Sequence, residues 1–253
     1  MTATSLLRLA VEPLIRWNWV GDHLDEIRSR GLEHLRLTVL TIAIGFAISF
    51  PLALLAHRHR RFYPPLTWVT GILYTIPSLA LFVALLPITG LGSTTALIGL
   101  VSYTLLIFIR NTVAGLDGVP EDAKEAARGM GYTRRQILWR VEVPLATPVI
   151  VAGVRIAAVT TVGLVTITAL IGLGGFGHFI LQGLQIFFST ATIVGAVLSV
   201  VLALVVDGAL LALQRILTPW AGRGGRPRWR GRKLGTAAGA AGDAAMSRPG
   251  GRS

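Results

Sequence analysis

Apolar tracts alternate with short polar segments along most of this 253-residue chain. An α-helix rises about 1.5 Å per residue, so about 20 apolar residues cross the hydrocarbon core of a bilayer, which is about 30 Å thick. The tracts that reach this length lie at residues 35–56, 66–86, 94–114, 146–170 and 190–213. The pattern predicts an all-α integral membrane protein with about five transmembrane helices.

Turn residues divide the apolar sequence between residues 62 and 109, where no charged side chain occurs. Pro87 and the glycines at 90 and 92 interrupt this stretch, so the second and third tracts are expected to form a hairpin. A glycine-rich turn at 172–177 follows the fourth tract. The segment 179–188 is too short to span and is predicted to form a short non-spanning helix.

Lysine and arginine residues gather on one side of the predicted spans. Cytoplasmic loops of membrane proteins carry an excess of these residues. The basic run at 57–61, the charged segment at 116–144 and the tail at 218–253 are therefore placed in the cytoplasm, and the two glycine-containing turns outside. This puts the N-terminus outside and the C-terminus inside. A sixth span through 179–188 would break the pattern and is rejected.

The two terminal segments differ in charge. Residues 1–34 carry nearly balanced charges together with Trp17 and Trp19, which is typical of an extracytoplasmic segment at the membrane interface. Residues 218–253 are rich in arginine and glycine and contribute much of the net charge of +12. Such a segment could bind nucleic acid through phosphates, but a disordered cytoplasmic tail attracted to anionic membrane lipid is favoured over nucleic-acid binding.

The composition excludes several classes of protein and site. With 53% hydrophobic and 14% charged residues and a mean hydropathy of +0.65, the chain is not a soluble domain with a polar surface. It has no cysteine, which excludes disulfides and thiolate metal sites. No phosphate-binding G-x-x-x-x-G-K-[ST] motif occurs, so no ATPase site is expected. His178 has no second ligand beside it, so no metal site is predicted.

A charged island at 120–144 separates the third and fourth predicted spans. A helix that starts at Pro120 and has an acidic first turn is expected there, because both features suit a helix N-terminus. Gly129 and Gly131 are predicted to break this helix. Thr133 is suited to cap a second short helix, which the prolines at 144 and 148 are expected to interrupt.

Two charged residues lie inside predicted spans. Arg155 and Asp207 each fall several residues inside the cytoplasmic end of a span. An unpaired charge at the centre of a span costs about 3 kcal/mol, so we hypothesise that the two side chains form an intramembrane ion pair between the last two spans. Snorkelling of both side chains, or contact with other subunits, is an alternative of equal weight.

The charged island carries a sequence signature. An E-A-A triplet is followed after three residues by glycine and, after nine more, by V-E-V-P. This order and spacing resemble the EAA loop of ABC-importer permeases, in which isoleucine and leucine stand where this chain has valines. An ordinary charged loop between two spans is the alternative. The resemblance implies an ATPase-coupling element made of Glu125, Ala126, Ala127, Gly129, Gly131, Val141 and Pro144.

Further stretches resemble the osmoprotectant branch of these permeases, which takes up glycine betaine, choline or carnitine. The likeness covers roughly residues 32–213. Methionine-type permeases share the EAA loop and a glycine-rich turn, so a same-fold permease for methionine or another small solute is the alternative. The family-like segments contain Ile76, Pro77, Ser78, Arg110, Asn111, Thr112, Gly174, Gly175 and Gly177.

The resemblance implies the small ABC-importer permease fold in a bacterial or archaeal cell membrane. Two permease subunits, identical or paralogous, would line the pathway, an ABC ATPase subunit would bind ATP, and an extracytoplasmic solute-binding protein would deliver the solute. No cofactor is expected in this chain, and no catalytic residue is assigned. A membrane-embedded enzyme would need converging acidic or histidine side chains, and a channel or scaffold would not need the EAA spacing; both are retained as distant alternatives.

Overall fold

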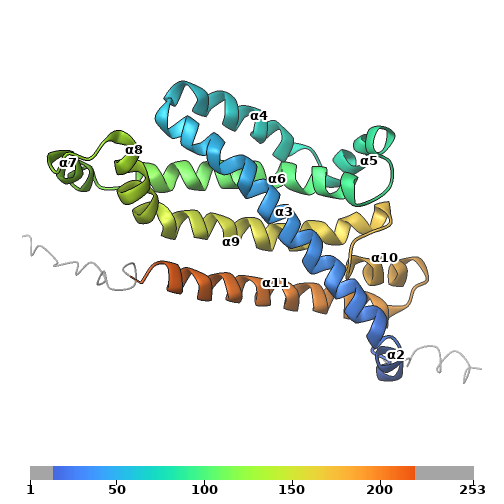
Figure 1. Ribbon diagram of the computed structural model, residues 1–253. Coiled ribbons are helices and arrows are strands. Elements are labelled where there is room, and N and C mark those ends of the chain that lie inside the picture. Colours follow the sequence, from blue (N-terminus) through green and yellow to red (C-terminus); the bar gives the residue numbers. More distant parts are fainter. Residues whose placement is uncertain (1–13, 220–253) are drawn as a thin grey trace, which may run out of the picture. The chain divides into compact units, whose positions relative to one another are not determined.

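The computed structural model describes residues 14–219, which form helices and no strands (Figure 1). Residues 1–13 and the basic tail from 220 onward lie outside the described residues. Within 14–219, four helices are long and apolar enough to cross a membrane, or up to five if one bent pair counts as a span. The single long helices are α3 (Leu24–Arg58), α6 (Ser93–Asp117), the continuous run Arg134–Ile171 and α11 (Ser189–Leu217).

The first long helix starts earlier than the predicted span. A short helix, α2 (Trp17–Asp22), precedes α3, and α3 then runs without a break through the boundary expected at 34/35. Its first turns are stabilised by Arg30, whose guanidinium lies 3.9 Å from Glu26 and 3.2 Å from Glu33. Residues 24–34 of the segment predicted to lie at the membrane interface are therefore a helical extension of the first span.

The second predicted span is not one straight helix. Instead α4 (Tyr63–Thr75) and α5 (Ser78–Thr89) are bent by 96° about a two-residue break. Ile76 and Pro77 are extended because proline lacks an N–H and disfavours the helical conformation in the residue before it. The buried Tyr103 hydroxyl donates a hydrogen bond to the Ile76 carbonyl that the break exposes. The tract predicted to span at 66–86 is therefore a sharply bent pair of helices, and the next turn falls at 90–92 as expected.

The predicted interruption at the prolines after the charged island is also wrong. α7 (Glu121–Gly129) is followed by α8 (Arg134–Ile137), a π-helical turn η2 (Leu138–Glu142) and α9 (Val143–Ile167) without a gap. Pro144 is tolerated because it is in the first turn of α9, next to the widened π-turn. Pro148 lies inside α9, where the Gln214 side chain of α11 donates to its carbonyl at 3.5 Å.

The short helix predicted between the last two spans is present. A 3₁₀ turn, η3 (Thr168–Ile171), ends the fourth span, and the glycine-rich turn leads into α10 (Gly177–Gln185). With 9 residues, α10 is too short to span a membrane. It packs on α11 and against the end of α9.

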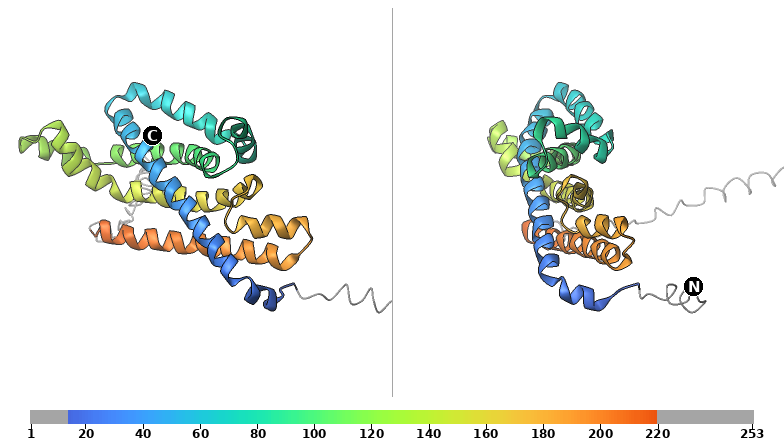
Figure 2. Two further views of the ribbon diagram at one scale, coloured as in Figure 1. Left: turned by 45° about the vertical axis from the view of Figure 1, so that its right-hand side comes forward. Right: turned by 90° about the vertical axis from the view of Figure 1, so that its right-hand side faces the viewer.

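Small residues bring the long helices close together. α3 crosses α6 and α9 obliquely, and α9 packs between α6 and α11 (Figures 1 and 2). A side chain added at Gly45 of α3 would collide with Thr104 of α6, and one at Gly153 of α9 would collide with Asn111. Close backbone approach of this kind is how helices associate in lipid, where no hydrophobic driving force acts between them.

Candidate functional site

The charged island at 120–144, here called the coupling segment after the role that the resemblance implies, begins with α7, which presents the start of the signature on its surface. Glu125 and Ala126 are exposed, whereas Ala127 is buried and its carbonyl accepts a hydrogen bond from the Tyr132 backbone at 3.1 Å. Glu121 in the first turn lies 3.0 Å from Lys124 and 2.9 Å from Arg128. Hydrogen bonds from these two cations hold the pKa of the Glu121 carboxyl below its usual range. Glu121 is therefore paired within α7, and Glu125 and Ala126 remain exposed on its surface.

A glycine turn joins α7 to α8. Gly131 has a φ of +80°, in the left-handed region, and its N–H donates to the Arg128 carbonyl at 2.9 Å. This is the glycine ending expected after a helix C-cap. Gly129 is the last residue of α7, and neither glycine has a neighbouring atom that an added Cβ would meet within 4 Å. Gly131 is therefore required for its backbone conformation and not for close packing.

α8 begins with a complete capping box. The Gln136 N–H donates to the Thr133 hydroxyl at 3.4 Å, and the Thr133 N–H donates to the Gln136 side-chain oxygen at 2.8 Å. The rest of the signature turns toward the spans, because Val141 and Pro144 are half-buried and Val143 packs on the cluster around Leu116. The E-A-A half of the signature is thus mostly exposed, whereas the V-E-V-P half packs against the membrane-spanning helices.

A charged network connects the C-terminal ends of α3 and α6 to the π-turn. His57 Nδ1 lies 2.8 Å from Asp117 Oδ1, and His57 Nε2 lies 3.4 Å from Glu142 Oε2. Arg60, in the 3₁₀ turn η1 (Arg60–Phe62), donates to both oxygens of Asp117 at 2.7 and 2.6 Å. We call these four residues the His57 network. No pattern in the sequence marks this network, because its members come from distant segments.

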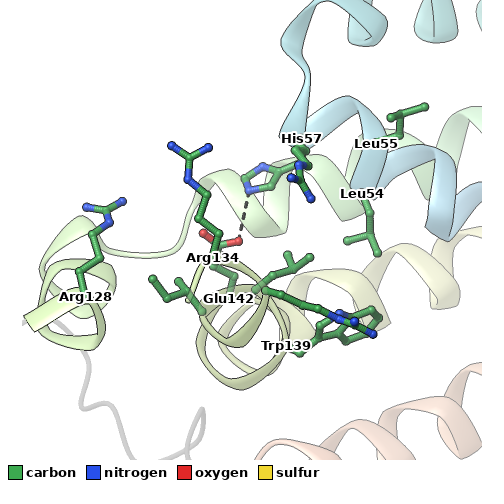
Figure 3. A pocket seen from close by; sticks show the side chains of 11 residues that line it. Leu54, Leu55, His57, Arg128, Arg134, Trp139 and Glu142 are labelled. Carbon is green, nitrogen blue, oxygen red and sulfur yellow. Dashed lines mark ion pairs between the residues drawn. The ribbon is translucent and has the colours of Figure 1, made fainter. Parts of the chain in front are cut away.

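An arginine-rich hollow of about 580 Å³ lies beside this network (Figure 3). Its walls come from the last turns of α3, from α7 and from α8 with the π-turn, and Figure 3 shows His57 and Glu142 paired with each other on its lining. Within residues 14–219, no carboxylate lies in ion-pair range of Arg58, Arg134 or Arg135. The hollow is therefore strongly basic, although Leu54, Leu55 and Trp139 also line it.

Arg155 and Asp207 meet in the membrane-spanning region. Arg155 Nε donates to Asp207 Oδ1 at 2.8 Å, and its terminal nitrogen donates to Oδ2 at 2.8 Å. Two parallel charge-assisted hydrogen bonds of this kind fix orientation as well as distance. The contact joins α9, which continues from the coupling segment, to α11.

The family-like segments lie elsewhere and do not converge on the coupling segment. Ile76, Pro77 and Ser78 make the break between α4 and α5, and the glycine-rich turn lies at the other end of α9 from α7 (Figure 1). In α6, Arg110 is exposed, the Asn111 amide donates to the Ile107 carbonyl at 2.8 Å, and Thr112 is buried. Side chains added in the glycine-rich turn would collide with neighbouring backbone or with His34, as at Gly174, Gly175 and Gly177.

No pattern in the sequence marks the fully buried His34 either. Its Nε2 lies 3.0 Å from the Val162 carbonyl, and the Phe176 N–H donates to its Nδ1 at 3.4 Å. These partners fix the tautomer, with the proton on Nε2. His34 thereby joins α3 to α9 and to the glycine-rich turn. His178, considered above, lies 3.7 Å from Glu26, and no group of three or more possible metal ligands occurs between residues 14 and 219.

The chain matches one protein family and is similar to several characterised permeases. Residues 45–219 match the family described as "Binding-protein-dependent transport system inner membrane component". The osmoprotectant import permease protein OsmW of Salmonella typhimurium is 37% identical over 80% of this chain and 96% of its own length. The carnitine transport permease protein OpuCB of Listeria monocytogenes is 37% identical over 77% of this chain and 89% of its own length.

Solved structures agree with the sequence relatives. A chain of the MetNI methionine ABC transporter in an inward-facing conformation is similar with a TM-score of 0.70 and 26% identity, over 76% of this chain and 96% of that chain. This likeness confirms the expected all-helical permease fold. The matched family and the near-complete coverage of its members show that this chain belongs to the inner membrane components of binding-protein-dependent transport systems.

Proposed function

We propose that this chain is the transmembrane permease subunit of an ATP-driven importer for osmoprotectants such as glycine betaine, choline or carnitine. The names of close relatives support this class of solute. Permeases named for osmoprotectant, carnitine and choline transport are 33–37% identical to this chain. The methionine transporter with the same fold is 26% identical, so methionine is the second candidate.

The geometry supports coupling to a separate ATPase through α7. Glu125 and Ala126 are exposed on a short helix that projects from the spans, and small side chains let another protein's backbone approach closely. The same segment passes through the π-turn into α9 without a gap, and Arg155 joins α9 to α11. A displacement of α7 by an ATPase would therefore be carried directly into two membrane-spanning helices.

The partners follow from this function. An ABC ATPase subunit would bind ATP, a second permease subunit would complete the pathway, and an extracytoplasmic binding protein would deliver the solute. Solute choice would rest mostly with that binding protein, where an aromatic cage suits a quaternary ammonium. That this chain needs no cofactor of its own stays a prediction. In the cell membrane, we place the coupling segment in the cytoplasm, with the N-terminus outside and the C-terminus inside, because the basic runs gather on that side.

Reconstitution of the chain with its ATPase and binding protein in vesicles tests the proposal. We expect labelled glycine betaine, choline or carnitine to enter only when ATP and the binding protein are both present. Labelled methionine is the matched control, because a same-fold methionine importer would move it instead. Entry of methionine alone would overturn the solute class and keep the importer, and entry of a solute without ATP would overturn the importer.

A further inference from the structure

We propose that His57 is a positioning residue that locks the coupling segment to the C-terminal ends of α3 and α6. The inference rests on the proposed function, because it concerns how movement of that segment reaches the spans. It assigns a role to a side chain outside the EAA signature. It also assigns one to Glu142, the second residue of V-E-V-P.

The geometry around His57 is that of a clamp. Its two ring nitrogens face carboxylates from two different elements, Asp117 at 2.8 Å and Glu142 at 3.4 Å. A protonated imidazole donates from both nitrogens, so it satisfies both carboxylates at once. Arg60, on the far side of Asp117, donates to both oxygens of that carboxylate. A neutral or shorter side chain at 57 would leave at least one carboxylate without its donor.

Burial makes the contact to Glu142 stronger than an ordinary surface ion pair. The His57 and Glu142 side chains are only 15% and 13% exposed, whereas Arg60 on the outer side is 60% exposed. Salt screens partly buried pairs much less than exposed ones. The contact between α3 and the π-turn is therefore the protected part of the network.

The position of the clamp explains what it would transmit. Glu142 is the last residue of the π-turn, between α8 and α9, so it sits where the coupling segment enters the membrane-spanning part. α9 is also packed closely on α6 at Gly115, where an added Cβ would lie 3.2 Å from the Ala146 carbonyl. Fixing Glu142 to α3 and α6 makes these three helix ends move together. Without the clamp, the coupling segment could follow the ATPase while α3 lags behind.

The experiment uses the complete reconstituted transporter and compares His57→Ala with wild type. We expect the ATPase to copurify and ATP to be hydrolysed within about twofold of the wild-type rate, while solute moved per ATP falls about tenfold, as loss of a charge-assisted hydrogen bond allows. His59→Ala is the matched control, because among the described residues the His59 side chain makes no hydrogen bond or ion pair, and its ring centroid lies 6.3 Å from that of Phe62. His59→Ala should leave the ratio of solute moved to ATP hydrolysed unchanged.

Two further variants separate positioning from simple structural support. Glu142→Gln keeps the shape of the side chain but removes its charge, so it should also lower the ratio. The double variant should be no worse than His57→Ala alone, because that substitution already removes the contact to Glu142. His57→Arg, which keeps a positive donor, should restore part of the ratio. An unchanged ratio in both single variants, a parallel loss of hydrolysis and uptake, or a failure of both to assemble would each overturn the proposal. Failure of the wild type itself to bind an ATPase would instead count against the proposed function.

Discussion

At the scale of single residues, the coupling segment depends on the backbone of Gly131. A residue other than glycine held in the left-handed region costs about 1–2 kcal/mol. Gly131 has a φ of +80°, but no atom lies within 4 Å of the place where its Cβ would be. The requirement at this position is therefore conformational, and a substitution would change the angle between α7 and α8 more than their packing.

We predict that Gly131→Ala weakens binding of the ATPase, because the alanine either strains the turn or changes its direction. The expected loss is about tenfold in affinity, which corresponds to a strain of about 1.4 kcal/mol. Binding of the purified ATPase to the chain in detergent measures it. Gly163→Ala is the matched control, since Gly163 lies inside α9, outside the ATPase-coupling element, with open space around it, and alanine favours a helix. Equal binding by both variants would contradict the prediction.

The Arg155–Asp207 contact predicts the outcome of a charge exchange. Arg155→Asp and Asp207→Arg alone should each abolish assembly, because each places two like charges together within the membrane-spanning region. The double variant should restore at least part of the assembled complex, since it re-forms the pair in reverse. Size-exclusion chromatography after solubilisation reports assembly. If the double variant fails as the single ones do, the pair does not join α9 to α11.

A contact between two side chains could be predicted from the sequence only where each residue stands out from its neighbours along the chain. Arg155 and Asp207 stand out because each is a lone charge in an apolar tract. His57 lies among other basic residues, and its partner Asp117 is 60 positions away. His34 and the Val162 carbonyl are 128 positions apart, so only the packing of α3 against α9 brings them together. No local pattern signals such contacts.

At the scale of elements, proline acts differently at its different positions. Pro77 stands at the break between α4 and α5, whereas Pro51, Pro87 and Pro148 lie inside helices. The break is stable because the Tyr103 hydroxyl donates to the Ile76 carbonyl. The sequence marks all four prolines alike, and only the structure shows which one ends a helix and which ones are accommodated inside one.

Tyr103→Phe is therefore expected to destabilise the bend. Loss of the hydroxyl leaves the Ile76 carbonyl without its donor, which costs about 1–3 kcal/mol when the group is buried. Thermal denaturation in detergent, followed by tryptophan fluorescence, should show a lower midpoint. Tyr74→Phe is the control, because between residues 14 and 219 no hydrogen bond is made by the Tyr74 hydroxyl, although its ring contacts Tyr103. A midpoint equal to that of wild type for Tyr103→Phe would refute this role.

The chain runs from α8 through the π-turn into α9 without a break. The sequence suggested that prolines end the second coupling helix, yet the π-turn at Leu138–Glu142 carries the chain directly into the span. A π-turn adds one residue to a helical turn and so changes which side chains face inward. The sequence located both helices of the segment through Thr133 and Gly131, but could not show that one of them is the start of a transmembrane helix.

At the scale of the whole molecule, apolar tract length predicted the fold class and the order of the spans. It could not separate a straight span from the bent pair α4 and α5, because both have the same apolar composition. α11 is also informative, since only 6% of its most apolar window is buried in the described part of the chain. Its remaining face is left for lipid or for the second permease subunit that the proposed function requires.

The orientation in the membrane can be tested with single cysteines, because the chain has none of its own. Leu91→Cys, in the exposed turn between α5 and α6, should react with an impermeant thiol reagent added to intact cells. Asp122→Cys, on α7, should react only after the membrane is opened. The opposite labelling pattern would reverse the proposed orientation and would remove the coupling segment from the cytoplasm.

The proposal that the exposed face of α7 binds the ATPase can be tested directly by changing one residue on that face. Ala126 is exposed, so Ala126→Arg should fold as the wild type does while blocking close approach of a partner. Ala126→Ser, which adds only a hydroxyl, is the matched control. We predict that the ATPase copurifies with the wild type and with Ala126→Ser, and is lost with Ala126→Arg. Undiminished copurification with Ala126→Arg would contradict the assignment of α7 as the docking element.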